Sequence, residues 1–160
     1  MKLLFSFIAT FILFFQNTDL ETVRESYTVA NLSQQNAEKF AKIVEKTSSS
    51  DIVFKGYKAA SEIVSAKFMK GSERRTTVSS GIKSLENIIA SNSNHIELRL
   101  IRLSIQENLP KIVNYSRNIN DDKNFILKNY EQQNNATKNY IKEFLKNSKS
   151  MTASEKASLK

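Results

Sequence analysis

Residues 95–110 constrain the fold more than any other part of this sequence. As an α-helix, which turns by about 100° per residue, the stretch places Ile96, Leu100 and Leu103 on one face. A second apolar group falls on nearly the opposite face and consists of Leu98, Ile101, Ile105 and Leu109. An ordinary surface helix needs only one apolar stripe, whereas a helix that is apolar on two sides packs between neighbours on both. The sequence therefore predicts a central helix with other elements packed on both of its sides.

Two narrow polar edges separate these apolar faces. Glu97 and Ser104 lie on one edge, and the other edge carries Arg99, Arg102 and Gln106. Because Arg99 and Arg102 are three residues apart, their side chains are neighbours and are able to hold one anion together. The alternative is that they form ion pairs with glutamates of adjacent helices. Both alternatives make these two arginines candidate site residues.

Glu107 is the third candidate. It lies on the same side of the helix as Leu100 and Leu103, close to the helix end. A carboxylate beside apolar residues needs a partner, since an unpaired one costs several kcal/mol. In a structural role, Glu107 pairs with an arginine or lysine, or caps a helix that starts at Pro110. In a functional role, it faces a ligand.

The rest of the sequence favours helices throughout. There are only three glycines and one proline, and helix-forming residues fill the polar positions. Apolar residues recur at helical spacing over about 28–47, over 52–68, in a segment ending near 91, after Pro110 and on both sides of a joint at 132–135. Polar turn signals lie between these segments, at 48–51, 71–72, 92–94 and 120–122.

These segments predict one all-α domain over residues 19–147. It has about six or seven antiparallel helices, arranged as a stack of helical hairpins or as a bundle. Four tyrosines are expected at the edge of its core with their hydroxyls reaching water: Tyr57, Tyr115, Tyr130 and Tyr140. From Lys146 onward the chain is polar and rich in serine and lysine, so we expect residues 148–160 to form a frayed tail.

The N-terminus has the pattern of a secretory signal. Lys2 is followed by an apolar run at residues 3–15 and then by polar residues. A membrane-spanning helix needs about 20 apolar residues, so this shorter run fits the apolar region of a signal peptide. We therefore expect residues 1–18 to be a signal peptide and the protein to be exported, to the periplasm or beyond. An uncleaved membrane anchor and a buried N-terminal helix are the alternatives.

Several kinds of chemistry are excluded by the residue inventory. The chain has no cysteine, which rules out disulfides, cysteine nucleophiles and thiolate metal sites. His95 is its only histidine, so there is no multi-histidine metal site, and we expect it to cap the start of the central helix. So few glycines leave no phosphate-cradling loop. We accordingly expect no catalytic residue, no metal and no cofactor.

The net charge of +8 is dispersed along the sequence. It serves solubility or fits an anionic partner. Aromatic residues are not interleaved with the basic ones in the manner of single-strand nucleic-acid binders. We therefore expect no nucleic-acid partner, and a membrane contact that is at most peripheral.

Parts of the sequence resemble two known groups of proteins. Four residues stand at the offsets of a tetratricopeptide repeat, and residues 94–97 look like the start of a next repeat; these four are Gly81, Leu85, Ile88 and Ser93. The resemblance implies a stack of helical hairpins. The chain also resembles uncharacterised exported helical proteins of Bacteroidetes, through residues 98–108 and 121–126.

Stacked helical hairpins form extended surfaces suited to binding. We therefore expect an exported, non-enzymatic helical interaction protein that binds another cell-envelope protein. The alternatives are a ligand-binding or enzymatic domain with a polar pocket around Arg99, Arg102 and Glu107, and a peripheral binder of anionic lipid or glycan.

Overall fold

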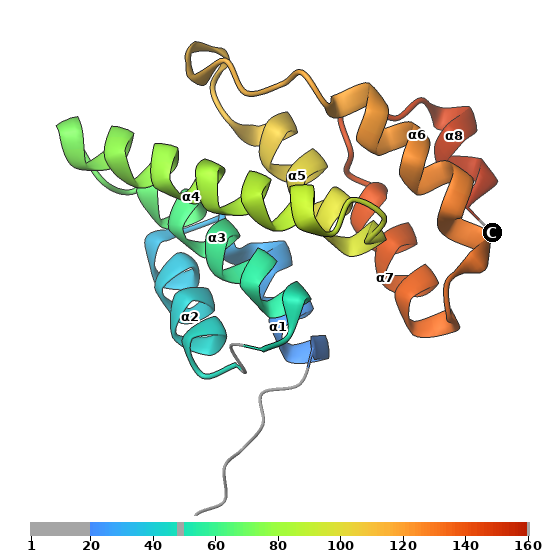
Figure 1. Ribbon diagram of the computed structural model, residues 1–160, viewed down its shortest axis with the longest axis horizontal. Coiled ribbons are helices and arrows are strands. Elements are labelled where there is room, and N and C mark those ends of the chain that lie inside the picture. Colours follow the sequence, from blue (N-terminus) through green and yellow to red (C-terminus); the bar gives the residue numbers. More distant parts are fainter. Residues whose placement is uncertain (1–19, 48–49, 160) are drawn as a thin grey trace, which may run out of the picture.

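The computed structural model describes residues 20–47 and 50–159. The signal peptide expected at residues 1–18 lies outside these ranges. Within them the chain forms eight α-helices and two short 3-10 turns, and no strand (Figure 1). The helices are α1 (Leu20–Ala30), α2 (Gln34–Glu45), α3 (Ile52–Ala66), α4 (Gly71–Ser91), α5 (Ile96–Asn108), α6 (Ile119–Asn129), α7 (Asn135–Leu145) and α8 (Ala153–Ser158). The protein is an all-α single domain, as the sequence predicts.

The helix α5 lies between two groups of helices. In the N-terminal group, α1 packs on α2, α2 on α3 and α3 on α4; α5 contacts α3 of this group and α6 of the C-terminal group, α6–α8. Figure 1 shows α1–α4 on one side of α5 and α6–α8 on the other. None of the described helices combines the length and the apolar composition that a membrane crossing requires.

Both apolar faces of α5 are covered, which confirms the central-helix prediction. One face carries Leu98, Ile101 and Ile105 and belongs to a hydrophobic core with side chains of α1–α4, among them Val23, Phe40, Tyr57, Ile63 and Leu85. The other face belongs to a second core with the C-terminal group, which contains Ile96, Leu100, Leu103, Ile126, Tyr130, Ile141 and Leu145. The domain therefore has two hydrophobic cores that share one helix.

Gly81 permits the close packing of α4 on α3. A Cβ atom at this position would lie 2.6 Å from Cγ1 of Ile63 and 3.0 Å from the backbone oxygen of Ala59. Both distances are shorter than ordinary van der Waals contact, so a larger residue would force the two helices apart. The glycine thus sits where α4 packs against α3 with no room for a side chain.

The first predicted helix, over about 28–47, is wrong in its extent. The segment contains two helices, because the chain turns at residues 31–33 between α1 and α2. The hydroxyl of Ser33 accepts the backbone N–H of Asn36 and caps α2, while the Asn36 side chain donates to the Val29 carbonyl at 3.1 Å. A serine cap and an asparagine bond therefore end one helix and begin the next.

Two further boundaries differ from expectation. Gly71 does not end a helix but is the first residue of α4, with a left-handed φ of +59°. The segment after Pro110 is a single 3-10 turn, Lys111–Val113, and Ile112 is 94% exposed instead of contributing to the core. Asn114 follows with φ of +54°, which ends the turn before a longer helix is able to form.

The C-terminal segment is packed where we expected a frayed tail over residues 148–160. Its helix α8 starts with a capping box in which Thr152 and Glu155 satisfy each other's backbone N–H groups. Met151 and Leu159 are buried in the second core. Two apolar anchors on either side of a capped helix therefore help to hold this otherwise polar segment in place.

Truncation of either face of α5 should destabilise the protein. Leu100 and Ile101 have no solvent exposure and belong to different cores. We expect Leu100→Ala and Ile101→Ala each to lower the free energy of unfolding by about 2–5 kcal/mol, measured by urea unfolding. Leu32→Ala is the matched control, because Leu32 is 71% exposed. If Leu100→Ala or Ile101→Ala lowers the free energy of unfolding by less than about 0.5 kcal/mol, α5 is not packed on both sides.

Candidate functional site

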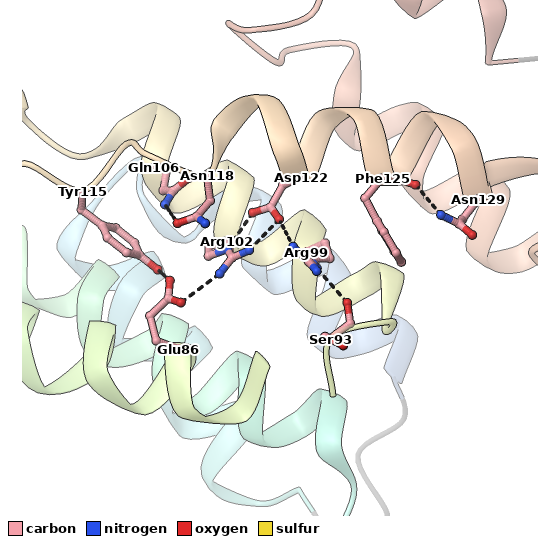
Figure 2. Close-up of polar contacts among 10 residues, drawn as sticks. All are labelled: Glu86, Ser93, Arg99, Arg102, Gln106, Tyr115, Asn118, Asp122, Phe125 and Asn129. Atoms are coloured by element: carbon pink, nitrogen blue, oxygen red, sulfur yellow. Dashed lines mark hydrogen bonds and ion pairs between the residues drawn. The ribbon is translucent and has the colours of Figure 1, made fainter. Parts of the chain in front are cut away.

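The two candidate arginines of α5 share one carboxylate. Asp122, in the first turn of α6, has no solvent exposure and accepts two hydrogen bonds from Arg102, from Nε and Nη2, both at 2.7 Å (Figure 2). Arg99 donates to the same carboxylate from Nη1 at 2.8 Å. Arg99 also donates to the backbone oxygen of Ser93 and stacks over the ring of Phe125 at 5.0 Å. The anion held jointly by the two arginines is therefore part of the chain itself.

Arg102 extends this cluster to a third helix. Its Nη1 donates to Glu86 of α4 at 2.9 Å, and Glu86 in turn accepts the hydroxyl proton of Tyr115. Figure 2 shows these side chains converging from α4, α5, α6 and the segment before α6. Burial raises the pKa of the Tyr115 hydroxyl, and so does its hydrogen bond to Glu86, which keeps Tyr115 protonated as a donor.

The opposite polar edge of α5 carries a second buried cluster. Glu97, 2% exposed, accepts two parallel hydrogen bonds from Arg24 of α1, at 2.8 Å from Nε and 2.6 Å from Nη2. Tyr57 of α3 donates to the same carboxylate at 2.7 Å. Burial alone would lower the pKa of Arg24, but its hydrogen bonds to Glu97 and the charge of Glu97 raise it above the ordinary value. Glu97 thus joins α5 to α1 and α3.

Three of the four tyrosines, Tyr57, Tyr115 and Tyr140, use their hydroxyls for hydrogen bonds to other side chains, which corrects the expectation that these hydroxyls reach water. The hydroxyls of Tyr57 and Tyr140 lie 2.9 Å apart, and the ring of Tyr140 lies 4.7 Å below the guanidinium of Arg24. Burial raises the pKa of Tyr57 and of Tyr140 well above the ordinary value. These contacts join α7 to the N-terminal group, since Tyr140 belongs to α7.

Glu107 holds the C-terminal segment. Its carboxylate accepts hydrogen bonds from the hydroxyl of Ser148 at 2.6 Å and from the hydroxyl and backbone N–H of Ser150, the latter at 2.9 Å. Lys149 adds a backbone N–H at 3.2 Å, and its ammonium donates to the backbone oxygen of Glu107 at 3.1 Å. Glu107 thus has a structural contact, but its carboxylate meets neither of the expected partners, a cationic side chain or a helix starting at Pro110.

The three candidate residues do not surround a common pocket. Arg99 and Arg102 face Asp122, whereas Glu107 faces residues 148–150. The two arginines are paired with carboxylates of the same chain, and the Glu107 carboxylate is hydrogen-bonded by residues 148–150, so the arrangement stabilises the packing of helices. Among the described residues, no group of three histidine, aspartate or glutamate side chains is placed to hold a metal. His95 precedes α5 as expected, but its side chain makes no capping hydrogen bond.

Two hollows on the surface are free of these internal contacts. One lies between α1 and α2, has a volume of about 180 Å³, and is lined by Thr22, Glu25, Ser26, Val29, Asn36, Lys39 and Ile43. The other, of about 520 Å³, is open to solvent along the outer face of α4 and is lined by Arg75, Thr76, Ser79, Ser80 and Lys83. Large apolar side chains are exposed near the first hollow and on the turn before α6: Val29, Leu32 and Ile112.

Comparison with protein-family models, curated proteins and solved structures finds no match to this chain. The repeat-like pattern around Gly81 and the resemblance to exported helical proteins therefore remain predictions.

Sequence reasoning missed the residues that complete the buried clusters. Arg24, Glu86 and Asp122 lie 73, 16 and 20 residues from their partners on α5. The available signal was the presence of Glu97 and Arg102 on a helix expected to be covered on both sides, since buried charges require partners. That signal predicts that partners exist without identifying them.

Glu107→Gln should loosen the C-terminal segment selectively. An amide keeps the shape of the side chain but replaces the charge-assisted hydrogen bonds to residues 148–150 by weaker ones. One of these bonds is lost, because the NH2 group of glutamine cannot accept a hydrogen bond. We expect the free energy of unfolding to fall by about 1–3 kcal/mol. Relative to the unmodified chain, amide hydrogen exchange should become faster in α8 and change less in α3. Glu143→Gln is the matched control, because Glu143 meets only Lys146 on the surface. Equal behaviour of the two variants would contradict the anchoring role.

Proposed function

We propose that this protein is an exported, non-enzymatic interaction protein that binds another cell-envelope protein through the end of the α1–α2 hairpin. The observation that carries the proposal is the pairing of a small hollow with two exposed aliphatic side chains beside it. Val29, 42% exposed, lines the hollow between α1 and α2, and Leu32, 71% exposed, follows it in the turn.

The turn presents these side chains in a defined position. The Val29 carbonyl accepts the backbone N–H of Leu32 and the side chain of Asn36, both at 3.1 Å. Lys67, at the end of α3, donates to the carbonyl of Asn31 at 2.6 Å. A surface fixed in this way loses little conformational entropy when a partner binds, which favours affinity.

The size and lining of the hollow favour a protein partner. Pockets for small ligands measure about 300–1,000 Å³, whereas this hollow measures about 180 Å³. It suits a single anchoring side chain of a partner, with Val29 and Ile43 as apolar contacts and Glu25 and Lys39 at its edge. Small anchor pockets beside exposed apolar groups are typical of energetically dominant interface positions.

The rival proposal of a polar ligand pocket at Arg99, Arg102 and Glu107 has less support. All three side chains are already hydrogen-bonded within the chain, and a ligand would have to displace Asp122 or residues 148–150. Such a displacement would leave a buried carboxylate without a partner, at a cost of several kcal/mol.

The experiment is photo-cross-linking in the cell, followed by a titration. A photoreactive amino acid at position 32 should cross-link one envelope protein, and a cell fractionation should recover the pair outside the cytoplasm. The purified partner should then bind Leu32→Ser about tenfold or more weakly than the unmodified chain, because an exposed apolar anchor is removed.

Ile112→Ser is the matched control, since Ile112 is also an exposed aliphatic residue but lies on a different turn. It should bind the partner with unchanged affinity. If position 32 cross-links nothing above background, or if Leu32→Ser binds the partner as tightly as the unmodified chain, the proposal is wrong.

A further inference from the structure

A second exposed surface lies at the turn between α5 and α6, over residues 110–118. Ile112 is 94% exposed there, more than any other large apolar side chain among the described residues. Lys111 and Arg117, within the same turn, are exposed, and the turn contains no acidic residue. Figure 1 shows this turn standing out from the helices at the upper edge of the molecule.

Hydrogen bonds within the 110–118 turn, and one from the turn to α4, fix its conformation. Val113 N–H donates to the Pro110 carbonyl at 2.9 Å and Asn114 N–H to the Lys111 carbonyl at 3.0 Å. Tyr115 is bonded to Glu86 of α4. Asn114 adopts the left-handed conformation, which is uncommon for residues other than glycine. Ile112 is therefore kept in water by a constrained backbone and does not fold back onto a core.

The outer face of α4 continues the positive charge of the turn. Tyr115 bonds Glu86, and Lys83 stands one helical turn before Glu86 on α4. Arg75 and Lys83 line the open hollow on this helix together with the hydroxyl groups of Thr76, Ser79 and Ser80. Among the described residues, no carboxylate forms an ion pair with either of these two cations or with the cations of the turn: Arg75, Lys83, Lys111 and Arg117.

Acidic residues offset this charge only in part. The exposed carboxylates closest in sequence are Glu73 and Asp121, against four exposed cations. Glu86 lies between the turn and α4, but Arg102 and Tyr115 already use its carboxylate. The 110–118 turn and the outer face of α4, linked through Tyr115 and Glu86, therefore both carry net positive charge, and the turn also carries one exposed isoleucine.

We propose that this surface docks the protein peripherally on an anionic membrane, with Ile112 entering the boundary between headgroups and acyl chains. Arg75, Lys83, Lys111 and Arg117 contact lipid phosphates, and the hydroxyls on α4 donate further hydrogen bonds to them. This inference concerns a different surface from the α1–α2 hairpin and does not depend on the protein partner proposed there.

The shape of the surface favours a bilayer over an acidic protein. Ile112 stands on a turn that projects from the helices, so a protein would need a matching pocket to cover it. A lipid interface accommodates a protruding side chain without such a pocket, while lysine and arginine extend their charges to the headgroups. One apolar anchor combined with several cations is the two-signal arrangement that peripheral binding requires.

The test is co-sedimentation of the protein, as isolated from cells, with vesicles of two compositions. One contains phosphatidylcholine alone, and the other contains about one third phosphatidylglycerol. Each cation near an anionic surface strengthens binding about fivefold, so four should give a preference of several hundredfold for the acidic vesicles. Raising the salt from about 0.1 M to about 0.5 M should weaken this binding strongly.

Variants assign the binding to specific residues. The double variant Lys111→Gln, Arg117→Gln should bind acidic vesicles about 25-fold more weakly, and Ile112→Ser about tenfold more weakly. Leu32→Ser, the matched control on the α1–α2 hairpin, should bind as the unmodified chain does. Any contribution of the apolar run at residues 3–15 is equal in all variants, so these ratios report on the turn alone. Equal thermal melting temperatures exclude a folding defect.

Two outcomes would overturn the proposal. In the first, the protein binds both kinds of vesicle equally, or the turn variants bind acidic vesicles as the unmodified chain does. In the second, neither kind of vesicle is bound. That second result would leave the partner proposal standing without the membrane.

Discussion

The hydrogen bonds of Arg102 are the interactions on which the arrangement of helices depends most. From the middle of α5 Arg102 reaches Asp122 of α6 through two hydrogen bonds of 2.7 Å and Glu86 of α4 through one of 2.9 Å. It therefore links the N-terminal group, the central helix and the C-terminal group. Burying a charge costs several kcal/mol unless it is paired and hydrogen-bonded. A different register of these helices would leave Arg102 or Asp122 unpaired, so the cluster favours one arrangement over other compact ones.

The helical phase of α5 could be predicted from the sequence because periodicity reports directly on burial. Ile96 and Leu100 fall in one core, Leu98 and Ile101 in the other, as the two-faced pattern requires. Strong local caps were also readable: Asp51 accepts the backbone N–H of Val53 at 2.8 Å at the start of α3. The break between α1 and α2 was missed, because apolar residues continue at helical spacing through a turn closed by Ser33 and Asn36 side chains.

For the candidate site, the sequence predicts the charged residues of α5 but not the residues that they contact. Sequence identifies Arg99, Arg102 and Glu107 as charges on a buried helix, but it does not identify partners that lie far along the chain. The arginines meet Asp122, which local reasoning assigned to a polar turn between helices, and Glu107 meets residues 148–150, where composition indicated a tail. The exposure of Leu32 and Ile112 was not predicted either, since an aliphatic residue in a helical pattern is ordinarily a core residue.

A double-mutant cycle on Arg102 and Asp122 tests the central claim most directly. Arg102→Met, Asp122→Asn and the double variant would be compared with the unmodified chain by urea unfolding. If the buried cluster holds the two groups of helices together, each single change should cost about 3–5 kcal/mol. The coupling energy should then be about 2 kcal/mol or more, because the second change removes a charge whose main hydrogen-bond partner the first change has already removed. Single losses below about 1 kcal/mol with a coupling energy near zero would contradict it.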